Sequence, residues 1–259
     1  MKNNFKTTII SAVLMMAASA IMLPQITQAD PAAGATKTDS KTGMEFVWIP
    51  KGCFTMGSEE GEKAERMPHK VCLKKGFWMG KYEVTQAQYE RIMDNNPSKF
   101  KGDDRPVDNV SWNDARDFIE EMSYVSGHDV RLPSEAEWEY ACKAGRNSKY
   151  CGPGGNADRL SWNDNNSGGK THTVGGKRAN GWGLYDMSGN VWEWVQDCYH
   201  KNYRGSPTDG SAWQEGGCGK RVLRGGSWYS TPHSLRSAAR SRTAADDRDD
   251  NLGFRLVQD

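Results

Sequence analysis

Six cysteines are the residues of this chain with the widest range of potential chemistry. Thiols can form disulfides, hold zinc or act as nucleophiles. Their even number favours disulfides, and they fall into three local pairs that would each close a short loop. A zinc site is the weaker alternative because no C-x₂-C or H-x₃₋₅-H spacing occurs, and reactive thiols remain a further alternative. We predict the disulfides Cys53–Cys72, Cys142–Cys151 and Cys198–Cys218.

Ser227, Ser230 and His233 are the other residues whose types could support nucleophilic catalysis. No third group that would orient the histidine is identifiable near them, so a catalytic triad is not indicated. The five histidines are scattered along the chain and do not form a recognisable iron motif. No glycine-rich phosphate loop occurs either, so a nucleotide cofactor is not indicated.

Residues 1–29 read as a secretory signal peptide. Lys2 and Lys6 precede an uncharged, mostly apolar stretch at 7–23, and Thr27-Gln28-Ala29 provides small residues for cleavage. An uncleaved membrane anchor is the alternative. No other segment approaches the ~20 apolar residues of a membrane span. We therefore expect a periplasmic or secreted protein, and such compartments allow disulfides to persist.

The composition indicates one globular domain. Lys and Arg number 34 against 33 Asp and Glu, and this near-balance argues against a nucleic-acid partner. An aromatic content of 10% excludes a chain that is disordered throughout. Residues 30–42 are small and polar and predict a flexible linker, so we place the domain at 43–259. Of 28 glycines, 19 lie beyond Lys143, where we expect short strands and long ordered loops.

Three helices and several strands must position these residues. Aromatic and β-branched residues predict a strand at 44–50 and a strand pair at 71–82 that is broken at Gly76. Thr85 and Ser134 each precede Gln or Glu by three residues, which is the signature of a capping box. Ser111 begins a third apolar pattern with helical spacing, and Gly127 ends it.

Segments throughout residues 43–259 resemble motifs of the formylglycine-generating enzyme, or sulfatase-modifying factor, family. The segments are FTMGS (54–58), GKYEVT (80–85), PV (106–107), VSW (110–112), RLPSEAEWEYA (131–141), NGWGLYDMSGNVWEW (180–194), RVLRGGSW (221–228) and LGFR (252–255). The resemblance implies an α+β fold, a variant of the C-type lectin fold with small antiparallel sheets, two to three helices and much ordered loop.

The resemblance also implies a catalytic site that this chain lacks. Enzymes of the family oxidise a cysteine to formylglycine with two cysteines that bind copper just after the GGS motif. In this sequence Ser230 matches the first of them, and residues 225–237 contain no cysteine. A hydroxyl cannot replace a thiolate as a soft ligand of Cu(I). We therefore expect no copper and no copper–cysteine chemistry.

Calcium is the metal that the resemblance favours. The loop 188–193 is similar to a family calcium site in which backbone carbonyls and a glutamate bind the ion. Hard oxygen ligands in one tight loop suit Ca²⁺. The alternative is that the glutamate pairs with a core arginine. The expected ligands are Ser188, Gly189, Asn190, Val191 and Glu193.

The tail of the chain resembles a second group on this fold, the variable proteins of diversity-generating retroelements. In that group, mutation of template adenines scatters a limited set of amino acids over a binding surface. Small, adaptable residues on a rigid frame are typical of such a surface. Ala244 is also a candidate variable position. The candidate ligand-binding residues are Trp228, Tyr229, Ser230, Thr231, His233, Ser234, Ala239, Ser241, Thr243, Asp246, Asp247, Asp249 and Asp250.

These observations lead to two hypotheses about function. The first is an exported module that binds a protein or a small-molecule ligand outside the cytoplasm through residues 228–251. The alternative is an accessory or maturation enzyme, resembling an oxidoreductase, that uses the same pocket without the cysteine pair. A formylglycine generator with displaced thiols is a weaker rival, because the six cysteines lie outside the segment that holds the family's catalytic pair.

Overall fold

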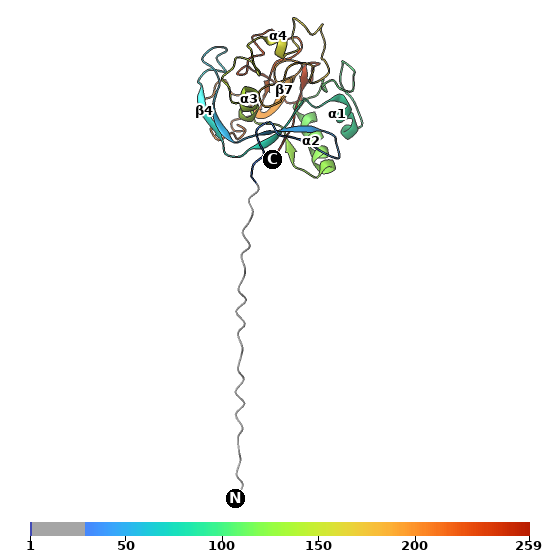
Figure 1. Cartoon of the computed structure of the whole chain (residues 1–259), viewed down its shortest axis with the longest axis vertical. Helices are drawn as coiled ribbons and strands as arrows, with labels where there is room; N and C mark the ends of the chain where they lie inside the picture. Colours follow the sequence, from blue (N-terminus) through green and yellow to red (C-terminus); the bar gives the residue numbers. More distant parts are fainter. Residues whose placement is uncertain (2–28) are drawn as a thin grey trace.

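A computed structural model describes residue 1 and residues 29–259 of the chain (Figure 1). The signal-peptide prediction falls almost wholly on residues 2–28 and lies outside the described residues. Three small sheets and four helices make up the described domain, with long ordered segments between them. The predicted α+β class is therefore confirmed.

The largest sheet has five antiparallel strands and includes part of the expected linker. Thr36–Thr38 pairs with the second strand, and backbone hydrogen bonds also join Gly34 and Ala35 to Trp48. The structure thus differs from a flexible linker at these residues, because the edge of the sheet supplies backbone partners that a local composition does not reveal. The strand order is β1 (Thr36–Thr38), β2 (Glu45–Ile49), β5 (Phe77–Gly80), β11 (Val257–Gln258) and β6 (Val130–Arg131).

The second sheet carries the tail of the chain, and a separate ribbon lies at the side of the domain. One pair of the second sheet, β10 with β7, is parallel and departs from the antiparallel expectation. The ribbon consists of β3 (Gly52–Met56) and β4 (His69–Leu73). The order of the second sheet is β10 (Leu252–Gly253), β7 (Trp192–Cys198), β8 (Arg221–Arg224) and β9 (Arg240–Thr243).

Gly76 separates two strands that belong to different sheets. The predicted pair at 71–82 is thus two strands, as expected, but β4 pairs with β3 while β5 pairs with β2 and β11. A Cβ atom at Gly76 would lie 2.4 Å from the Trp48 ring and 2.8 Å from the Ile49 carbonyl oxygen. Only glycine allows the chain to cross from one sheet to the other at this point.

Capping boxes begin the three main helices. The side chains of Thr85, Ser111 and Ser134 each accept a hydrogen bond from the backbone N–H of the third helical residue. The side chain of that third residue accepts a hydrogen bond from the backbone N–H of the capping residue. These helix starts were predicted. The fourth helix is a single turn in the region expected to hold only strands and loops. The helices are α1 (Gln86–Met93), α2 (Trp112–Ser126), α3 (Glu135–Lys143) and α4 (Ala157–Leu160).

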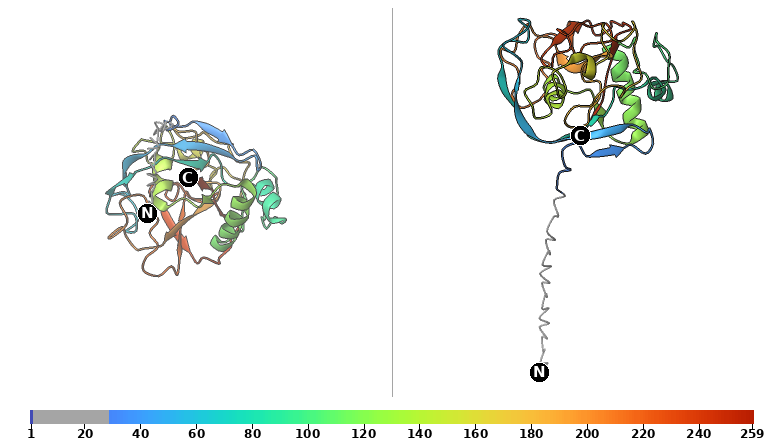
Figure 2. Two further views of the ribbon diagram at one scale, coloured as in Figure 1. Left: turned by 90° about the horizontal axis from the view of Figure 1, so that it is seen from below. Right: turned by 45° about the horizontal axis from the view of Figure 1, so that its top comes forward.

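Two apolar clusters fill the domain on either side of the sheets. Helices α1 and α2 pack on the first, where the rings of Tyr89 and Phe118 stack at 5.3 Å and Phe254 meets Phe118 edge-on at 5.4 Å. The second surrounds Trp138 of α3. Figures 1 and 2 show α1 and α2 on one side of the domain and the β3–β4 ribbon on the other. No helix of the described residues is long and apolar enough to span a membrane.

Candidate functional site

All six cysteines form the predicted disulfides. Cys53 is joined to Cys72 across the β3–β4 ribbon, and Cys142 at the end of α3 is joined to Cys151. Cys198 at the end of β7 is joined to Cys218. No free cysteine exists among the described residues, so the zinc and reactive-thiol alternatives have no thiol to act through in this state.

Ser230, which the resemblance matches to a family catalytic cysteine, is buried. Its hydroxyl oxygen accepts a hydrogen bond from the backbone N–H of Ser227 at 2.9 Å and lies 3.3 Å from the Ser227 hydroxyl. His233 instead lies beside Glu62, with 3.4 Å between Nε2 and the carboxylate. The structure thus places these two side chains with different partners, the Ser230 hydroxyl with Ser227 and the His233 ring with Glu62.

Five of the candidate ligand-binding residues line one surface depression of about 280 Å³ beside strand β9. We call it the β9 depression. Polar groups dominate its lining, which also includes the exposed residue Tyr229. Trp192, Leu223 and Leu252 contribute the apolar part of the lining. The five candidate residues are Tyr229, Ser241, Thr243, Asp247 and Asp249.

The remaining candidates do not join this surface. Ala239 is buried, and its carbonyl oxygen accepts a hydrogen bond from Arg224 Nη1 at 2.7 Å, so it is part of the frame. Trp228 donates from its indole to the Asp250 carbonyl oxygen, and Asp250 pairs with Lys99. Outside the lining are Trp228, Ser230, Thr231, His233, Ser234, Ala239, Asp246 and Asp250.

Opposite electrostatic environments surround the two carboxylates of the β9 depression. Hydrogen bonds from the Thr243 hydroxyl and the Ala244 backbone lower the pKa of Asp247. Partial burial, reinforced by the neighbouring Asp250, raises the pKa of Asp249. Arg248 is anchored by two 2.6 Å bonds to Asp114 at the start of α2. This ion pair ties the loop that carries both aspartates to a helix.

Three buried carboxylates lie near the predicted calcium loop, and we call them the acidic cluster: Glu83, Asp186 and Glu193. Burial, together with the charges of Asp186 and Glu193, raises the pKa of Glu83 well above its usual value. Burial raises the pKa of Asp186 to about 6. The Asp186 Oδ1 atom is buried and has no hydrogen-bond partner among the described residues. Arg255 is the one guanidinium that contacts the cluster through a salt bridge among those residues.

The expected calcium ligand Glu193 is engaged by the protein itself. Its two oxygens accept hydrogen bonds from Arg255 at 2.7 and 2.6 Å, and Trp138 Nε1 donates to one of them at 2.7 Å. This is the alternative that the sequence left open, a glutamate paired with a core arginine. Asn190 donates to Glu83 at 2.6 Å, and Ser188 donates to the Leu235 carbonyl oxygen. The side chains of these loop residues are thus already hydrogen-bonded.

Backbone geometry shapes the same loop. Gly189 has φ of +86°, and a Cβ atom there would lie 2.2 Å from the Trp162 carbonyl oxygen. The Val191 backbone N–H donates to Glu83 at 3.1 Å. The residues missed by the sequence analysis are Glu83 and Asp186. Both stand in family-like segments, KYEVT and LYDMS, where a charged residue among apolar neighbours was the available signal.

A buried ion-pair network fixes the frame behind the tail. Arg224 Nη2 donates to Glu139 at 2.6 Å, and the same carboxylate accepts from Lys143 at 2.7 Å. Arg240 forms a forked pair with Glu135 at 2.7 and 2.6 Å. Because these acids lie on α3, the network attaches the chain on both sides of Ala239 to that helix.

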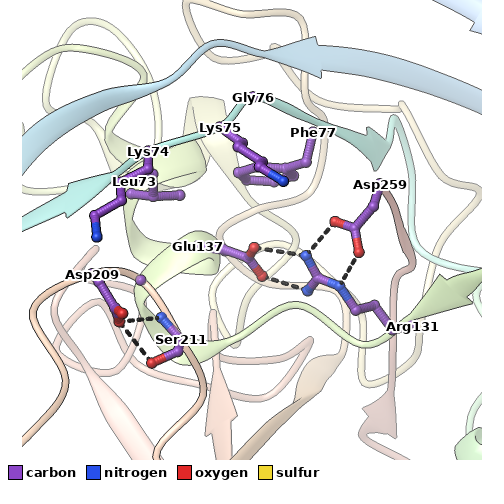
Figure 3. A pocket seen from close by; sticks show the side chains of 11 residues that line it. Leu73, Lys74, Lys75, Gly76, Phe77, Arg131, Glu137, Asp209, Ser211 and Asp259 are labelled. Carbon is purple, nitrogen blue, oxygen red and sulfur yellow. Dashed lines mark hydrogen bonds and ion pairs between the residues drawn. The ribbon is translucent and has the colours of Figure 1, made fainter.

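A second hollow, of about 290 Å³, lies where β4 turns into β5 (Figure 3). Arg131 stands on its wall and donates to both Glu137, at 2.7 Å, and Asp259, at 2.7 Å. All the hydrogen-bonding directions of this guanidinium are used by these two acids and the Leu132 carbonyl oxygen. The hollow therefore anchors the last residue rather than presenting an available cation at Arg131.

Comparisons with known proteins agree with this fold and identify its family. Residues 32–259 match the model of the sulfatase-modifying factor enzyme 1-like domain. The chain is 30% identical over 279 residues to chaperone protein LppX of Paenibacillus barcinonensis, which covers 87% of this chain and 93% of the relative. It is 28% identical over 293 residues to the formylglycine-generating enzyme of Mycobacterium tuberculosis, covering 83% and 98%.

Two solved structures are similar over nearly their whole length. PvdO from Pseudomonas aeruginosa superposes with a TM-score of 0.80 at 31% identity, covering 88% of this chain and 99% of that one. Treponema denticola variable protein 1 superposes with a TM-score of 0.79 at 29% identity, covering 86% and 98%. The chain therefore belongs to the sulfatase-modifying factor enzyme 1-like domain family.

Proposed function

We propose that the protein is a binding module of this family, and that the β9 depression is its recognition surface for a protein or small-molecule ligand. The observation that carries the proposal is the gathering of Tyr229, Ser241, Thr243, Asp247 and Asp249 around one hollow. A tyrosine with short polar neighbours makes contacts at low entropic cost, as paratopes do. The buried network behind β9 supplies a rigid support.

The names of the similar proteins point to both functions, because several curated relatives are named formylglycine-generating enzymes. One relative is named a chaperone protein, and one structural neighbour is named a variable protein. The six cysteines, all in disulfides, leave no thiolate for copper. A periplasmic or secreted location, which the disulfides suit, remains part of the proposal. The alternative, a maturation enzyme, draws on Asp249, because a carboxyl whose pKa is raised at a surface hollow can serve in proton transfer.

Calcium binding at the acidic cluster is a second part of the proposal. Among residues 29–259 no three acidic, histidine or cysteine side chains are arranged to hold a metal ion, so an ion would rest on Asp186, whose buried Oδ1 atom is unpartnered there, and on backbone carbonyls of the loop 188–193. Asp186 would be the principal carboxylate ligand. The ion would supply structural charge compensation, while Arg255 keeps Glu193 in place.

Photocrosslinking in the native host tests the binding surface. A photoreactive phenylalanine at Tyr229 should crosslink to one recurrent partner. The matched control carries the same group at Thr231, an exposed position outside the depression. Partner capture from both positions alike, or from neither, would contradict a protein ligand at this surface.

A second measurement separates the diversified binder from the enzyme. The 3′ end of the gene is sequenced across many cells together with its flanking DNA. Codon changes that gather at Tyr229 and the aspartates, spare Ala239, and match adenines in a nearby repeat would indicate a diversified binder. An invariant tail favours a fixed partner or an enzyme. Incubation of the copper-treated protein with a cysteine-containing sulfatase peptide should leave the peptide mass unchanged.

A further inference from the structure

A groove runs beside strand β3, on residues that the β9 depression does not use. Two hollows form it, of about 330 Å³ and about 440 Å³, and they share Thr55, Lys143 and Asn147 as lining residues. We call this the β3 groove. One wall is β3 itself, and the other is the turn that follows α3 at 145–149. Its volume lies in the range of sites that hold ligands.

The free edge of β3 faces this groove. The β3–β4 ribbon has two strands, so within residues 29–259 β3 has no strand partner on its other side. Cys53 and Cys72 lie directly opposite each other with their Cα atoms 4.0 Å apart, which is the close spacing of a non-hydrogen-bonded pair. The Cys72 N–H confirms this, because it points out of the ribbon and donates to the Thr208 carbonyl oxygen.

Because hydrogen-bonded and non-hydrogen-bonded pairs alternate along two antiparallel strands, the direction of each backbone N–H and C=O group of β3 follows from the Cys53–Cys72 pair. Cys53 and Thr55 direct their N–H and C=O groups away from β4, toward the groove. Two side chains of α3 already act as strand partners at one end. Lys143 donates to the Thr55 carbonyl oxygen at 2.7 Å, and Glu139 accepts from the Gly57 N–H at 2.9 Å. The outward groups of Cys53 and the Thr55 N–H have no partner in the described part of the chain.

The side chains of the smaller hollow indicate the character of an occupant. Phe54 and Tyr140 provide aromatic surface, with ring centroids 5.3 Å apart. Lys143 and Arg146 are its charged residues, and no carboxylate lines it. Glu139 compensates Lys143, whereas Arg146 forms no ion pair among residues 29–259. The hollow is therefore suited to an incoming negative charge.

We propose that an extended peptide segment carrying an acidic side chain binds in the β3 groove as a third strand of the ribbon. Its backbone would pair with Cys53 and Thr55, and its carboxylate would meet Arg146. Strand addition of this kind obtains affinity from main-chain hydrogen bonds and specificity from alternate side chains. The site is separate from the proposed recognition surface, so either can fail without the other.

Two blocked pentapeptides test the proposal, Ac-TVEVT-NH₂ and its matched control Ac-TVKVT-NH₂. With the full-length protein, the glutamate peptide should bind at least tenfold more tightly in a titration followed by NMR. Amide hydrogen exchange should slow at Cys53 and Thr55 and stay unchanged at Phe54, whose N–H belongs to the β3–β4 ladder. Equal affinities, or protection confined to other residues, would overturn the proposal.

Matched variants separate the backbone pairing from the charge. Thr55→Pro removes the outward N–H and fixes φ at this residue, a change that an edge strand tolerates, and should weaken binding at least tenfold. Thr55→Val keeps that N–H and should bind as the parent does. Arg146→Glu should reverse the preference toward the lysine peptide. N-methylation of the glutamate peptide tests the pairing on unaltered protein, and undiminished binding of it would refute strand addition.

Discussion

Asp186 illustrates how one buried residue couples charge, stability and ion binding. Its pKa is raised by burial from the usual 3.8 to about 6, so the folded state prefers the protonated acid. The unfolded chain binds fewer protons between these two values, and the free energy of unfolding therefore falls as the pH rises from about 4 to about 6. The loss amounts to about 3 kcal/mol at neutral pH. A cation beside Oδ1 would offset it.

Asp186→Asn should therefore raise the melting temperature at pH 7 without calcium, because it removes an uncompensated buried charge. It should also flatten the fall in stability between pH 4 and pH 6. The parent should gain melting temperature on addition of Ca²⁺, more at pH 7 than at pH 5, because binding requires the carboxylate. The variant should lose that gain. Scanning calorimetry in EDTA and in Ca²⁺ measures both, and an equal calcium response of parent and variant would contradict the site.

Glu139 is also a buried carboxylate, but unlike Asp186 it is paired with cationic side chains. Burial opposes its charged form, yet Lys143 and Arg224 hold its pKa below the usual value. Glu139→Gln should cost about 3–5 kcal/mol of unfolding free energy, because it leaves buried Lys143 without a carboxylate and Arg224 with only the more distant Glu135. Glu45→Gln is the control: its pair with Lys81 is partly exposed, and its loss should cost under about 1 kcal/mol. Urea denaturation compares the two, and equal effects would contradict the network's role.

Short strands and helices position the β9 depression. Strand β9 and the loop after it present the depression, while α3 holds them from behind through Glu135 and Glu139. Helix α1 contributes to the core through Tyr89 and begins at the Thr85 capping box. Such a box stabilises a helix by satisfying backbone donors that the first turn leaves unpaired.

Thr85→Ala should lower the unfolding free energy by about 1 kcal/mol, because the side chain no longer accepts the hydrogen bond from the Gln88 N–H. Thr85→Ser keeps the hydroxyl and should retain most of the stability. The denaturant midpoint at unchanged slope measures the difference. Similar losses in both variants would show that the methyl group, and not the cap, is responsible.

The whole molecule combines a modest core with covalent cross-links. The disulfides join residues separated by 19, 9 and 20 positions, so they restrict the unfolded chain locally. Loops of this size correspond to about 3 kcal/mol each in the chain-entropy description. Together they stabilise a domain in which long loops replace regular structure.

The unreduced protein, unfolded in urea, should show no reactive thiol, and reduction should reveal six. The double variant Cys53→Ser/Cys72→Ser should unfold with about 3 kcal/mol less free energy, because the unfolded chain regains the freedom of that loop. Thiol titration and thermal melts measure these outcomes. Free thiols in the unreduced protein would instead support the hypothesis of an enzyme that uses displaced thiols.

Local chemistry is sufficient to predict several features of this protein. Helix starts at Thr85, Ser111 and Ser134 follow from hydrogen bonds within one turn, and the three disulfides follow from cysteines that lie near each other along the chain. The family resemblance, which the match over 32–259 bears out, extended these signals to the fold class. The absence of a cysteine after the GGS motif is likewise evident from the sequence alone.

Contacts between distant segments decided the rest. Only the fold shows that Glu193 meets Arg255, 62 positions away, and that Asp186 and Glu83 share its surroundings. It also separates Tyr229, which lines a hollow, from its neighbour Ser230, whose buried hydroxyl is bonded to Ser227. A strand edge at Thr36–Thr38 appeared where composition suggested a linker. In each case the physical reason is that burial, pairing and charge compensation are properties of residues brought together in space, which spacing along the chain does not encode.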